Sequence, residues 1–212
     1  MTTQQKIEEL NKIAQEIKSF QGLDIARNAT HAVPGEGHPD AQIMFIGEAP
    51  GQVEDSTGRP FVGQSGQLMR KTLTETTSIQ PEEVFITNIV KFRPPDNRDP
   101  NDIEIETCRD WLDRQINVIQ PKIICTLGRF SMAKFIPGVT ISRVHGQPRF
   151  VTFQGNKFII FPMYHPAAAL RGTGTLNEFK QDFNKLKNLL DPASPPKDLQ
   201  SQPSQPLQAS LF

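Results

Sequence analysis

Three short stretches of the chain bring carboxylate, amide and imidazole side chains together with small residues. They are Gly47-Glu-Ala-Pro-Gly51, Thr87-Asn88 with the basic loop after it, and Tyr164-His165-Pro166. Such side chains can position a water molecule, read the polar edge of a ligand and stabilise a developing negative charge. Taken singly each stretch is a weak signal, because Glu, Asn and His-Pro are also common in ordinary turns. The combination of all three stretches is a far more specific signal of a functional site.

The apolar pattern predicts the elements that must hold these residues. The run Ile43 to Ile46 is too short for a helix and is bounded by turn residues, so it indicates a buried strand. Strands and helices then alternate, which predicts an α/β fold with a mostly parallel sheet and helices on both faces. In such a sheet ligands bind at the carboxyl ends of the strands, where the three polar stretches fall. The expected elements are helices over 3–19, 65–76, 102–119, 130–136 and 176–190, and strands over 84–90, 122–127, 150–153 and 157–161.

Size and composition bound the class of protein. The 212 residues, 36% hydrophobic and 22% charged, fit one globular domain, which we place at 1–190. No apolar run approaches the roughly 20 residues of a membrane span and no secretory signal is present, so we expect a cytoplasmic protein without a membrane partner. The Pro-, Ser- and Gln-rich residues 191–207 predict a disordered linker. A formal net charge of zero argues against a generic polyanion binder but allows one basic face.

Five motifs, in this order along the chain, resemble those of the family 4 uracil-DNA glycosylases. The resemblance covers roughly residues 5–190. It implies a three-layer uracil-DNA glycosylase-like fold and a monofunctional enzyme that starts base excision repair by hydrolysing the N-glycosidic bond of a uracil flipped out of DNA. The motifs are Gly47-Glu-Ala-Pro-Gly51, Gly58-Arg-Pro-Phe-Val-Gly63, Thr87-Asn-Ile-Val-Lys91, Arg93-Pro-Pro95 with Asn97-Arg98, and His165-Pro-Ala-Ala168 through Arg171.

The resemblance also implies roles for individual residues. Glu48 would position the attacking water, with Glu54 as a second carboxylate whose share of this task stays open, and a neutral His165 would donate a hydrogen bond to uracil O2. Asn88 fits base recognition on chemical grounds, because its amide can donate to O4 and accept from N3–H, whereas cytosine presents the reverse pattern. The other expected substrate-binding residues are Gly47, Ala49, Phe61, which would stack on the base, and Asn97. The expected DNA-contacting residues are Arg93, Arg98, His145 and Arg171.

One feature of the family is missing from this chain. Members typically hold a four-iron, four-sulfur cluster on four cysteines, and the matching positions here are Lys18, Gln21, Phe92 and Cys108. One thiolate cannot hold such a cluster, so we expect no metal and no other cofactor. We expect apolar contacts of Phe92 and Lys18 to replace the packing role of the cluster. The departure should affect loop stability and DNA affinity more than catalysis.

The last five residues, Gln208-Ala-Ser-Leu-Phe212, predict an attachment to a partner. Leu211 and Phe212 would be exposed at the end of a linker and bring no folding benefit there. The pentapeptide resembles the bacterial sliding-clamp binding motif, in which a leading glutamine makes polar contacts and a final Leu-Phe pair fills a hydrophobic cleft. Gln208, Leu211 and Phe212 are therefore the expected clamp-binding residues, and an ordinary frayed terminus is the alternative. Uracil-containing DNA and the clamp are the expected partners of a monomeric enzyme.

Two other functional classes compete with this interpretation. A non-catalytic uracil- or damaged-DNA binding protein of the same fold would keep the pocket without turnover, but the presence of Glu48, Asn88 and His165 favours the enzyme. An α/β hydrolase or nucleotide-binding domain is disfavoured, because the sequence has no Gly-x-Ser-x-Gly elbow and no phosphate-cradling glycine loop. The sequence leaves open the substrate range beyond uracil and the preference for single or double strands.

Overall fold

A central six-stranded sheet organises the protein, whose computed structural model describes residues 1–190. The predicted linker, 191–207, and the predicted clamp-binding residues, 208–212, lie outside the described residues. The strand order is β1-β3-β2-β4-β6-β5, with the four inner strands parallel and the two edge strands antiparallel to their neighbours. The predicted α/β fold with a mostly parallel sheet is therefore confirmed. The strands are β1 Glu36–Gly37, β2 Ile43–Gly47, β3 Phe85–Asn88, β4 Ile123–Leu127, β5 Arg149–Phe153 and β6 Asn156–Met163.

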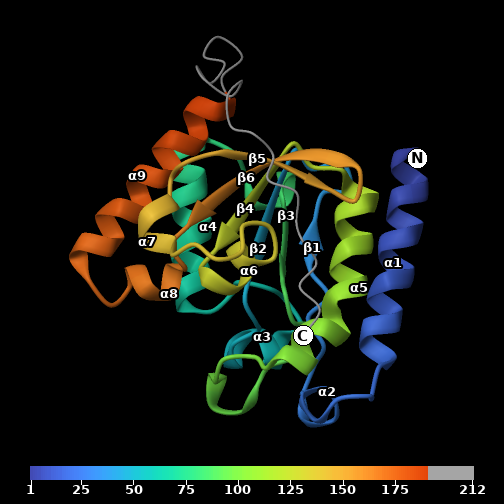
Figure 1. Cartoon of the computed structure of the whole chain (residues 1–212). Coiled ribbons are helices and arrows are strands. Elements are labelled where there is room, and N and C mark those ends of the chain that lie inside the picture. The colour runs from blue at the N-terminus through green and yellow to red at the C-terminus, as the bar shows by residue number, and fades with distance from the viewer. Residues whose placement is uncertain (191–212) are drawn as a thin grey trace.

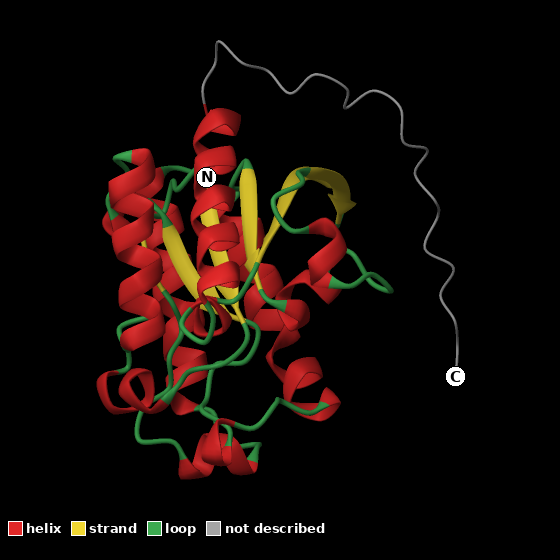
Figure 2. Cartoon of the chain, turned by 90° about the vertical axis from the view of Figure 1, so that its left-hand side faces the viewer, coloured by secondary structure: helices red, strands yellow, loops and turns green. Residues whose placement is uncertain are grey.

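Four long helices form the outer layers (Figures 1 and 2). Helices α4 and α9 cover one face of the sheet, while α5 covers the other and α1 packs on the outside of α5. The long helices are α1 Thr3–Ser19, α4 Gln64–Thr77, α5 Asp102–Ile119 and α9 Thr173–Leu190. The short helices are α2 Asp24–Asn28, α3 Gln52–Thr57, α6 Arg129–Ala133, α7 Ile141–Val144 and α8 Pro166–Ala169, with single 3₁₀ turns η1 Pro81–Glu83 and η2 Pro95–Asn97. None of these helices is long and apolar enough to cross a membrane.

The sheet is buried on both faces, which explains the unbroken apolar run of its central strand. In β2, Ile43 and Phe45 pack toward α4 and α9, whereas Met44 and Ile46 pack toward α5. A strand with helices on both sides needs an apolar residue at every position, so the alternation typical of a half-exposed strand is absent. All five residues of β2 are buried.

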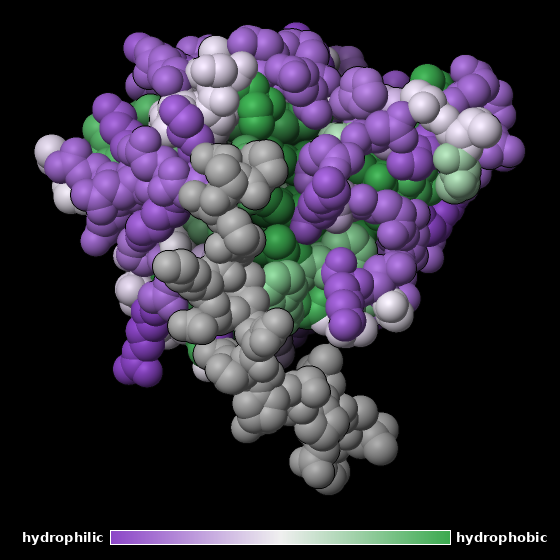
Figure 3. Space-filling view, turned by 90° about the horizontal axis from the view of Figure 1, so that it is seen from above, coloured by the Kyte–Doolittle hydropathy of each residue, from purple (hydrophilic) through white to green (hydrophobic). Residues whose placement is uncertain are grey.

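The carboxyl ends of the parallel strands lie together at one end of the molecule, where α3, η2 and α8 gather (Figure 1). Figure 3 shows the opposite end, where polar residues form much of the surface outside the atoms drawn in grey and hydrophobic residues show between them. The predicted strand over 84–90 is shorter than expected, ending at Asn88. The amides of Ile89 and Val90 still donate to the carbonyls of Gly47 and Glu48, both at 3.0 Å, which ties the exit of β3 to that of β2.

An aromatic cluster of Phe20, Phe92 and Trp111 lies in the region of the four positions that match the family's iron–sulfur ligands. Phe92 is 2% exposed, and its ring centroid lies 6.1 Å from that of Phe20 and 6.4 Å from that of Trp111. Cys108 is buried in the same cluster. The prediction that Lys18 contributes to this packing is wrong, because Lys18 is exposed and Phe20 supplies the contact instead.

The residues of this region do not fit an iron–sulfur cluster. Gln21 and Lys18 are exposed, Phe92 fills the interior with a ring, and only Cys108 offers a thiol. Within residues 1–190 no group of three His, Cys, Asp or Glu side chains is placed to hold a metal ion. That side-chain packing replaces the role of the cluster stays a prediction.

Phe92→Ala should lower the free energy of unfolding by about 3 to 5 kcal/mol, because it leaves a cavity between Phe20 and Trp111 in a close-packed core. Urea denaturation of the variant and the parent protein measures this difference. Phe150→Ala is the matched control, since Phe150 is 50% exposed and its loss should change stability by well under 1 kcal/mol. A similar small change for Phe92→Ala would contradict the role of the cluster in stability.

Candidate active site

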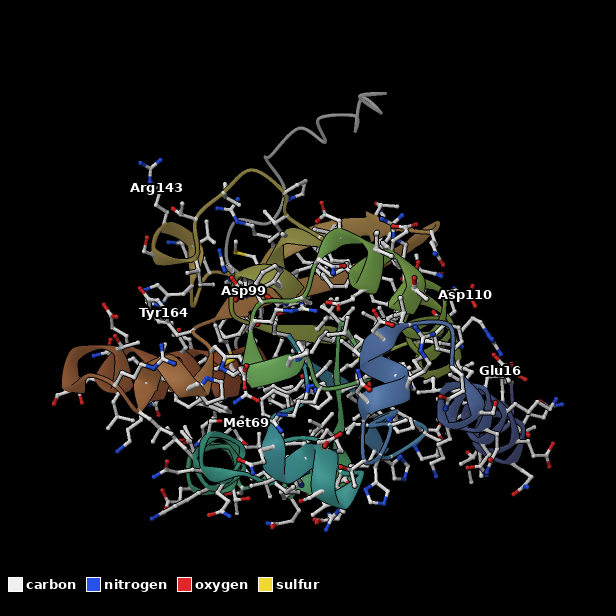
Figure 4. All side chains as sticks on the ribbon, turned by 90° about the horizontal axis from the view of Figure 1, so that it is seen from below. Glu16, Met69, Asp99, Asp110, Arg143 and Tyr164 are labelled. Atoms are coloured by element: carbon white, nitrogen blue, oxygen red, sulfur yellow. The ribbon has the colours of Figure 1, made fainter. Side chains whose placement is uncertain are left out.

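A cavity of about 430 Å³ lies at the carboxyl ends of the strands. Figure 4 looks at this end of the molecule, with the cavity-lining Asp99 near its middle. The cavity brings together nine of the residues singled out in the sequence: Glu48, Ala49, Glu54, Phe61, Asn88, Asn97, Arg98, His165 and Arg171. The sequence-predicted residues Gly47, Arg93 and His145 do not line it. Lining residues that were not predicted are Pro50, Gly51, Ser65, Pro94, Asp99, Ala167 and Ala168.

Asn88 is the most deeply buried polar group of the cavity. It ends β3, opposite Gly47 in the parallel register with β2, and is 1% exposed. Its Oδ1 atom is buried and has no hydrogen-bond partner among residues 1–190. A buried acceptor left unpaired costs roughly 1 to 3 kcal/mol, so its retention points to a ligand that donates a hydrogen bond here.

Gly47 contributes space and no side chain. A Cβ atom at this position would overlap both Asn88 Oδ1 and the ring of Phe61. The glycine therefore lets an amide and an aromatic ring approach the same point at the end of β2. This explains why Gly47 belongs to the site without lining the cavity.

Phe61 is held in an unusual conformation beside the cavity. Its φ of 52° lies in the left-handed region, which costs on the order of 1 to 3 kcal/mol for a residue with a side chain. Arg70 on α4 offsets this strain, since its guanidinium donates to the carbonyls of Phe61 and Pro60, each at 2.8 Å. Arg70 is paired in turn with Glu36 at 2.6 Å. The Phe61 ring ends 5.9 Å from the His165 ring, centroid to centroid.

His165 is the N-cap residue of α8, and this position fixes its tautomer. The Ala167 amide donates to His165 Nδ1 at 3.2 Å, so the neutral ring carries its proton on Nε2. Burial lowers the pKa of His165 to about 4, with a further lowering by Arg171 and an opposing effect of Glu54. The cavity is therefore lined by a neutral imidazole that can donate one hydrogen bond.

The two glutamates of the site have different surroundings. Glu54 lies on α3, and its Oε1 accepts from the amides of Val62 and Gly63 at 2.9 and 2.7 Å. Glu54 thus fixes the loop that carries Phe61. The pKa of Glu48 is raised by burial and then by the charge of Asp99, while Arg129 opposes the shift, and no hydrogen bond contributes. Glu48 lines the cavity on the loop that follows β2.

The loop after β3 is braced by its own charged side chains. Arg93 Nε donates to Asn97 Oδ1 at 2.8 Å, and Arg98 binds both carboxylate oxygens of Glu104 on α5, at 2.9 and 2.6 Å. The Arg98 pair lowers the pKa of Glu104. Asp99 on the same loop is paired with Arg129 of α6. These contacts hold Asn97 and Arg98 at the rim of the cavity.

His145 lies outside the cavity lining. Its Nδ1 is 2.9 Å from Oδ2 of the fully buried Asp182 on α9, and its ring packs 4.4 Å from that of Tyr164. Arg143, on the preceding short helix, projects from the periphery of the face in Figure 4, away from Asp99. His145 therefore links α9 to Tyr164, the residue that precedes His165. The expected contact of His145 with DNA stays a prediction.

The residues missed by sequence reasoning act on the backbone. Arg70 was hidden in an ordinary amphipathic helix pattern, and its contacts with Phe61 and Pro60 depend on a loop conformation that no local motif encodes. Ser65, in the first turn of α4, and Asp99, on the loop before α5, also line the cavity. For Asp99 the cluster of charge after Arg-Pro-Pro was the available signal.

Comparison with known proteins agrees with this arrangement. The family model of the uracil DNA glycosylase superfamily matches residues 34–187 of the chain, which include the three polar strand ends. The chain belongs to this superfamily. It is 44% identical over 188 residues to the type-4 uracil-DNA glycosylase of Sulfurisphaera tokodaii, with 86% of each chain covered. It is 42% identical over 195 residues to that of Archaeoglobus fulgidus, covering 89% of this chain and 97% of the relative.

A bacterial relative extends the comparison. The type-4 uracil-DNA glycosylase of Thermotoga maritima is 40% identical over 190 residues, which cover 86% of this chain and 96% of the relative. The resemblance noted in the motifs is thereby confirmed. In this member of the superfamily the motif residues of β2, β3 and the loop after β6 meet in one cavity.

The imidazole of His165 should be neutral at pH 7 with its proton on Nε2, and should titrate near pH 4. In the unfolded chain it titrates near 6.5, so between these values the unfolded state binds the proton first and folding stability falls as the pH is lowered. NMR of protein labelled with nitrogen isotopes on histidine reads both the tautomer and the titration, with His165→Gln identifying the signal. A proton on Nδ1 at pH 7, or a transition near pH 6.5, would contradict this assignment.

Proposed function

We propose that the protein is a uracil-DNA glycosylase that binds a uracil flipped out of DNA and hydrolyses its N-glycosidic bond, the first step of base excision repair. The observation that carries this proposal is the buried, unpartnered Asn88 Oδ1 in a cavity shared with Phe61 and His165. Uracil N3–H supplies the missing donor, and uracil O4 accepts from the Asn88 amide nitrogen. Cytosine has an acceptor at N3 and a donor at C4, so it would leave the pair unmatched.

His165 stabilises the leaving base. Breaking the glycosidic bond places negative charge on the uracil, and much of that charge is on O2. A neutral ring that donates from Nε2 can strengthen its hydrogen bond as the charge grows, which lowers the barrier. The fixed tautomer of His165 supports this role, because Nδ1 is held by the Ala167 amide.

Glu48 positions the water that attacks the sugar. Its raised pKa and its lack of a protein hydrogen bond support this assignment, whereas Oε1 of Glu54 is engaged by two backbone amides. We assign Glu54 to the shape of the pocket wall and to the placement of Phe61, which stacks on the base. Ala49 and Gly51 line the cavity beside these carboxylates and leave room for the water.

Exposed residues around the cavity contact the DNA. Arg171 lines the cavity, and Leu170 beside it is 44% exposed, so the pair can bind a phosphate and fill the gap left by the flipped base. The side chain of Arg98 is 44% exposed although it is paired with Glu104. Arg98 and Arg93 can both bind phosphate while they keep their hydrogen bonds to Glu104 and Asn97. A phosphate contact of His145 would have to use Nε2, because Nδ1 faces Asp182.

The enzyme works as a monomer without an iron–sulfur cluster or another cofactor. The packing of Phe20, Phe92 and Trp111 supports this proposal, because it fills the region of the ligand positions with aromatic rings. Hydrolysis of a glycosidic bond by a carboxylate and an imidazole needs no redox group. Because the substrate is DNA, we assign the enzyme to the cytoplasm.

Purified protein, shown to be free of iron by elemental analysis, should release uracil from a single-stranded oligonucleotide and leave an alkali-labile site. His165→Ala should slow this reaction by about 2.7 to 4 kcal/mol of transition-state stabilisation, as for loss of an oxyanion donor. Single-turnover cleavage measures the rate. His38→Ala is the matched control, because His38 is exposed and makes only a local contact with the Asp40 amide. Tight binding of uracil DNA without cleavage would instead establish the non-catalytic alternative.

Asn88→Asp should shift selectivity from uracil toward cytosine, because a protonated carboxyl can match the reversed donor and acceptor pattern of that base. The same cleavage assay on a matched cytosine oligonucleotide measures the shift. The ratio of cytosine to uracil cleavage should rise by about tenfold or more, since one mismatched buried hydrogen bond costs roughly 1 to 3 kcal/mol. An unchanged ratio would remove Asn88 from base recognition.

We also propose that Gln208, Leu211 and Phe212 attach the enzyme to the sliding clamp through the linker at 191–207. The motif-like order of these residues at the chain end supports this. Burial of the two apolar side chains gives on the order of 3 to 6 kcal/mol before ordering costs, which suits an exchangeable attachment. Titration of the clamp should show binding by the full chain and a loss of at least about tenfold after truncation beyond Leu207. Equal affinity of both forms would remove the proposal, and the truncated enzyme should still cleave free uracil oligonucleotides.

A further inference from the structure

A fully buried lysine lies directly behind the base-recognition residue. Lys91 is 0% exposed, and its Nζ donates to the Asn88 carbonyl at 2.9 Å, to Thr87 Oγ1 at 2.7 Å and to Gln115 Oε1 at 2.8 Å. Lysine is almost never fully buried unless it is paired with an opposite charge. Neither the base contacts nor the water contacts described above use this residue.

All three partners of Lys91 act as acceptors. The Thr87 hydroxyl donates its only proton to the Pro34 carbonyl at 2.9 Å, and the Gln115 amide nitrogen donates to the same carbonyl at 2.9 Å, which turns Oε1 toward Lys91. A neutral amine has two N–H groups, whereas an ammonium has three. The hydrogen-bond pattern therefore requires the charged form. Burial lowers the pKa of Lys91 to about 7, and the three acceptors favour retention of the proton.

Within residues 1–190 Lys91 has no carboxylate counter-ion, and the thiol that interacts with it, Cys108, stays protonated because burial raises its pKa. None of the ion pairs found within residues 1–190 includes this lysine, and its three partners are neutral oxygens. In a protein interior the field of such a charge is weakly screened. One residue of backbone, that of Asn88, separates the ammonium from the cavity.

We propose that Lys91 is a positioning residue with an electrostatic function: its ammonium fixes Asn88 through the backbone carbonyl and stabilises the uracil anion as it leaves. This inference rests on the proposed glycosylase function and deepens it. At an effective dielectric constant of about 20, a unit positive charge stabilises an anion roughly 10 Å away by about tenfold in equilibrium constant. Asn88 recognises the base through hydrogen bonds, and the positive charge of Lys91 stabilises the same base electrostatically.

Lys91→Met removes the charge and keeps an unbranched side chain. The test compares single-turnover release of uracil with release of 5-fluorouracil from otherwise identical single-stranded oligonucleotides. Fluorine withdraws electrons, so the 5-fluorouracil anion is intrinsically more stable and needs less help from the protein. Lys91→Met should slow uracil release by about tenfold, and 5-fluorouracil release by a clearly smaller factor.

A second variant keeps the lysine and neutralises its field. Gln115→Glu places a carboxylate at the position of Oε1, 2.8 Å from Nζ, and converts the isolated cation into an ion pair. Gln115→Glu should also slow uracil release more than 5-fluorouracil release. This variant keeps the test decisive if circular dichroism shows that Lys91→Met folds poorly. Thr87→Val is the matched control, because, like Gln115→Glu, it removes one hydrogen bond to the Pro34 carbonyl, and it removes one from Lys91, but it changes no charge. Any rate loss in the control should be the same for both bases.

Three outcomes of this comparison test the electrostatic role of Lys91 and the glycosylase function separately. A larger loss with uracil than with 5-fluorouracil in the charge-changing variants, and not in Thr87→Val, supports the electrostatic role. Equal losses for the two bases in Gln115→Glu, or unchanged rates, would overturn it while leaving the glycosylase function intact. Failure of the parent protein to release either base would instead overturn the proposed function, and the inference with it.

Discussion

The site depends on the approach of Asn88 to Gly47 across the parallel pair β2 and β3. The register places the two residues side by side at the ends of their strands, and only a residue without a Cβ atom leaves room for the amide. The ring of Phe61 enters the same space, and Arg70 holds the strained loop that brings it there. This crowded contact places an unpaired acceptor, Asn88 Oδ1, and an aromatic ring together at the cavity wall.

Burial, more than contact between charges, sets the electrostatics of the cavity. It lowers the pKa of His165 and of Lys91 and raises that of Glu48, so the imidazole of His165 is neutral at pH 7. The hydrogen bonds then decide which form each group keeps: one amide fixes the His165 tautomer, and three acceptors hold the Lys91 proton. A low-dielectric wall of this kind is suited to a reaction that transfers negative charge to a leaving group.

The sequence predicted the long elements and most of the cavity lining, because apolar periodicity and strand-end polarity are local signals. It did not predict α3, α8 or the Arg70 contacts, since these follow from loops that close only when the sheet is assembled. The error at Lys18 has a simple cause. The buried face of α1 runs through Ile13 and Ile17 and is continued by Phe20, three residues on, whereas Lys18 lies on the exposed side of the helix.

The aromatic cluster of Phe20, Phe92 and Trp111 also changes what the protein requires from the cell. In the proposed cluster-free enzyme this region would mature as soon as folding is complete, without iron supply or assembly factors. In this region the thiol that could react with oxidants that break down metal–sulfide clusters is that of Cys108. That thiol is buried and its pKa is raised mainly by burial, so little of the reactive thiolate is present.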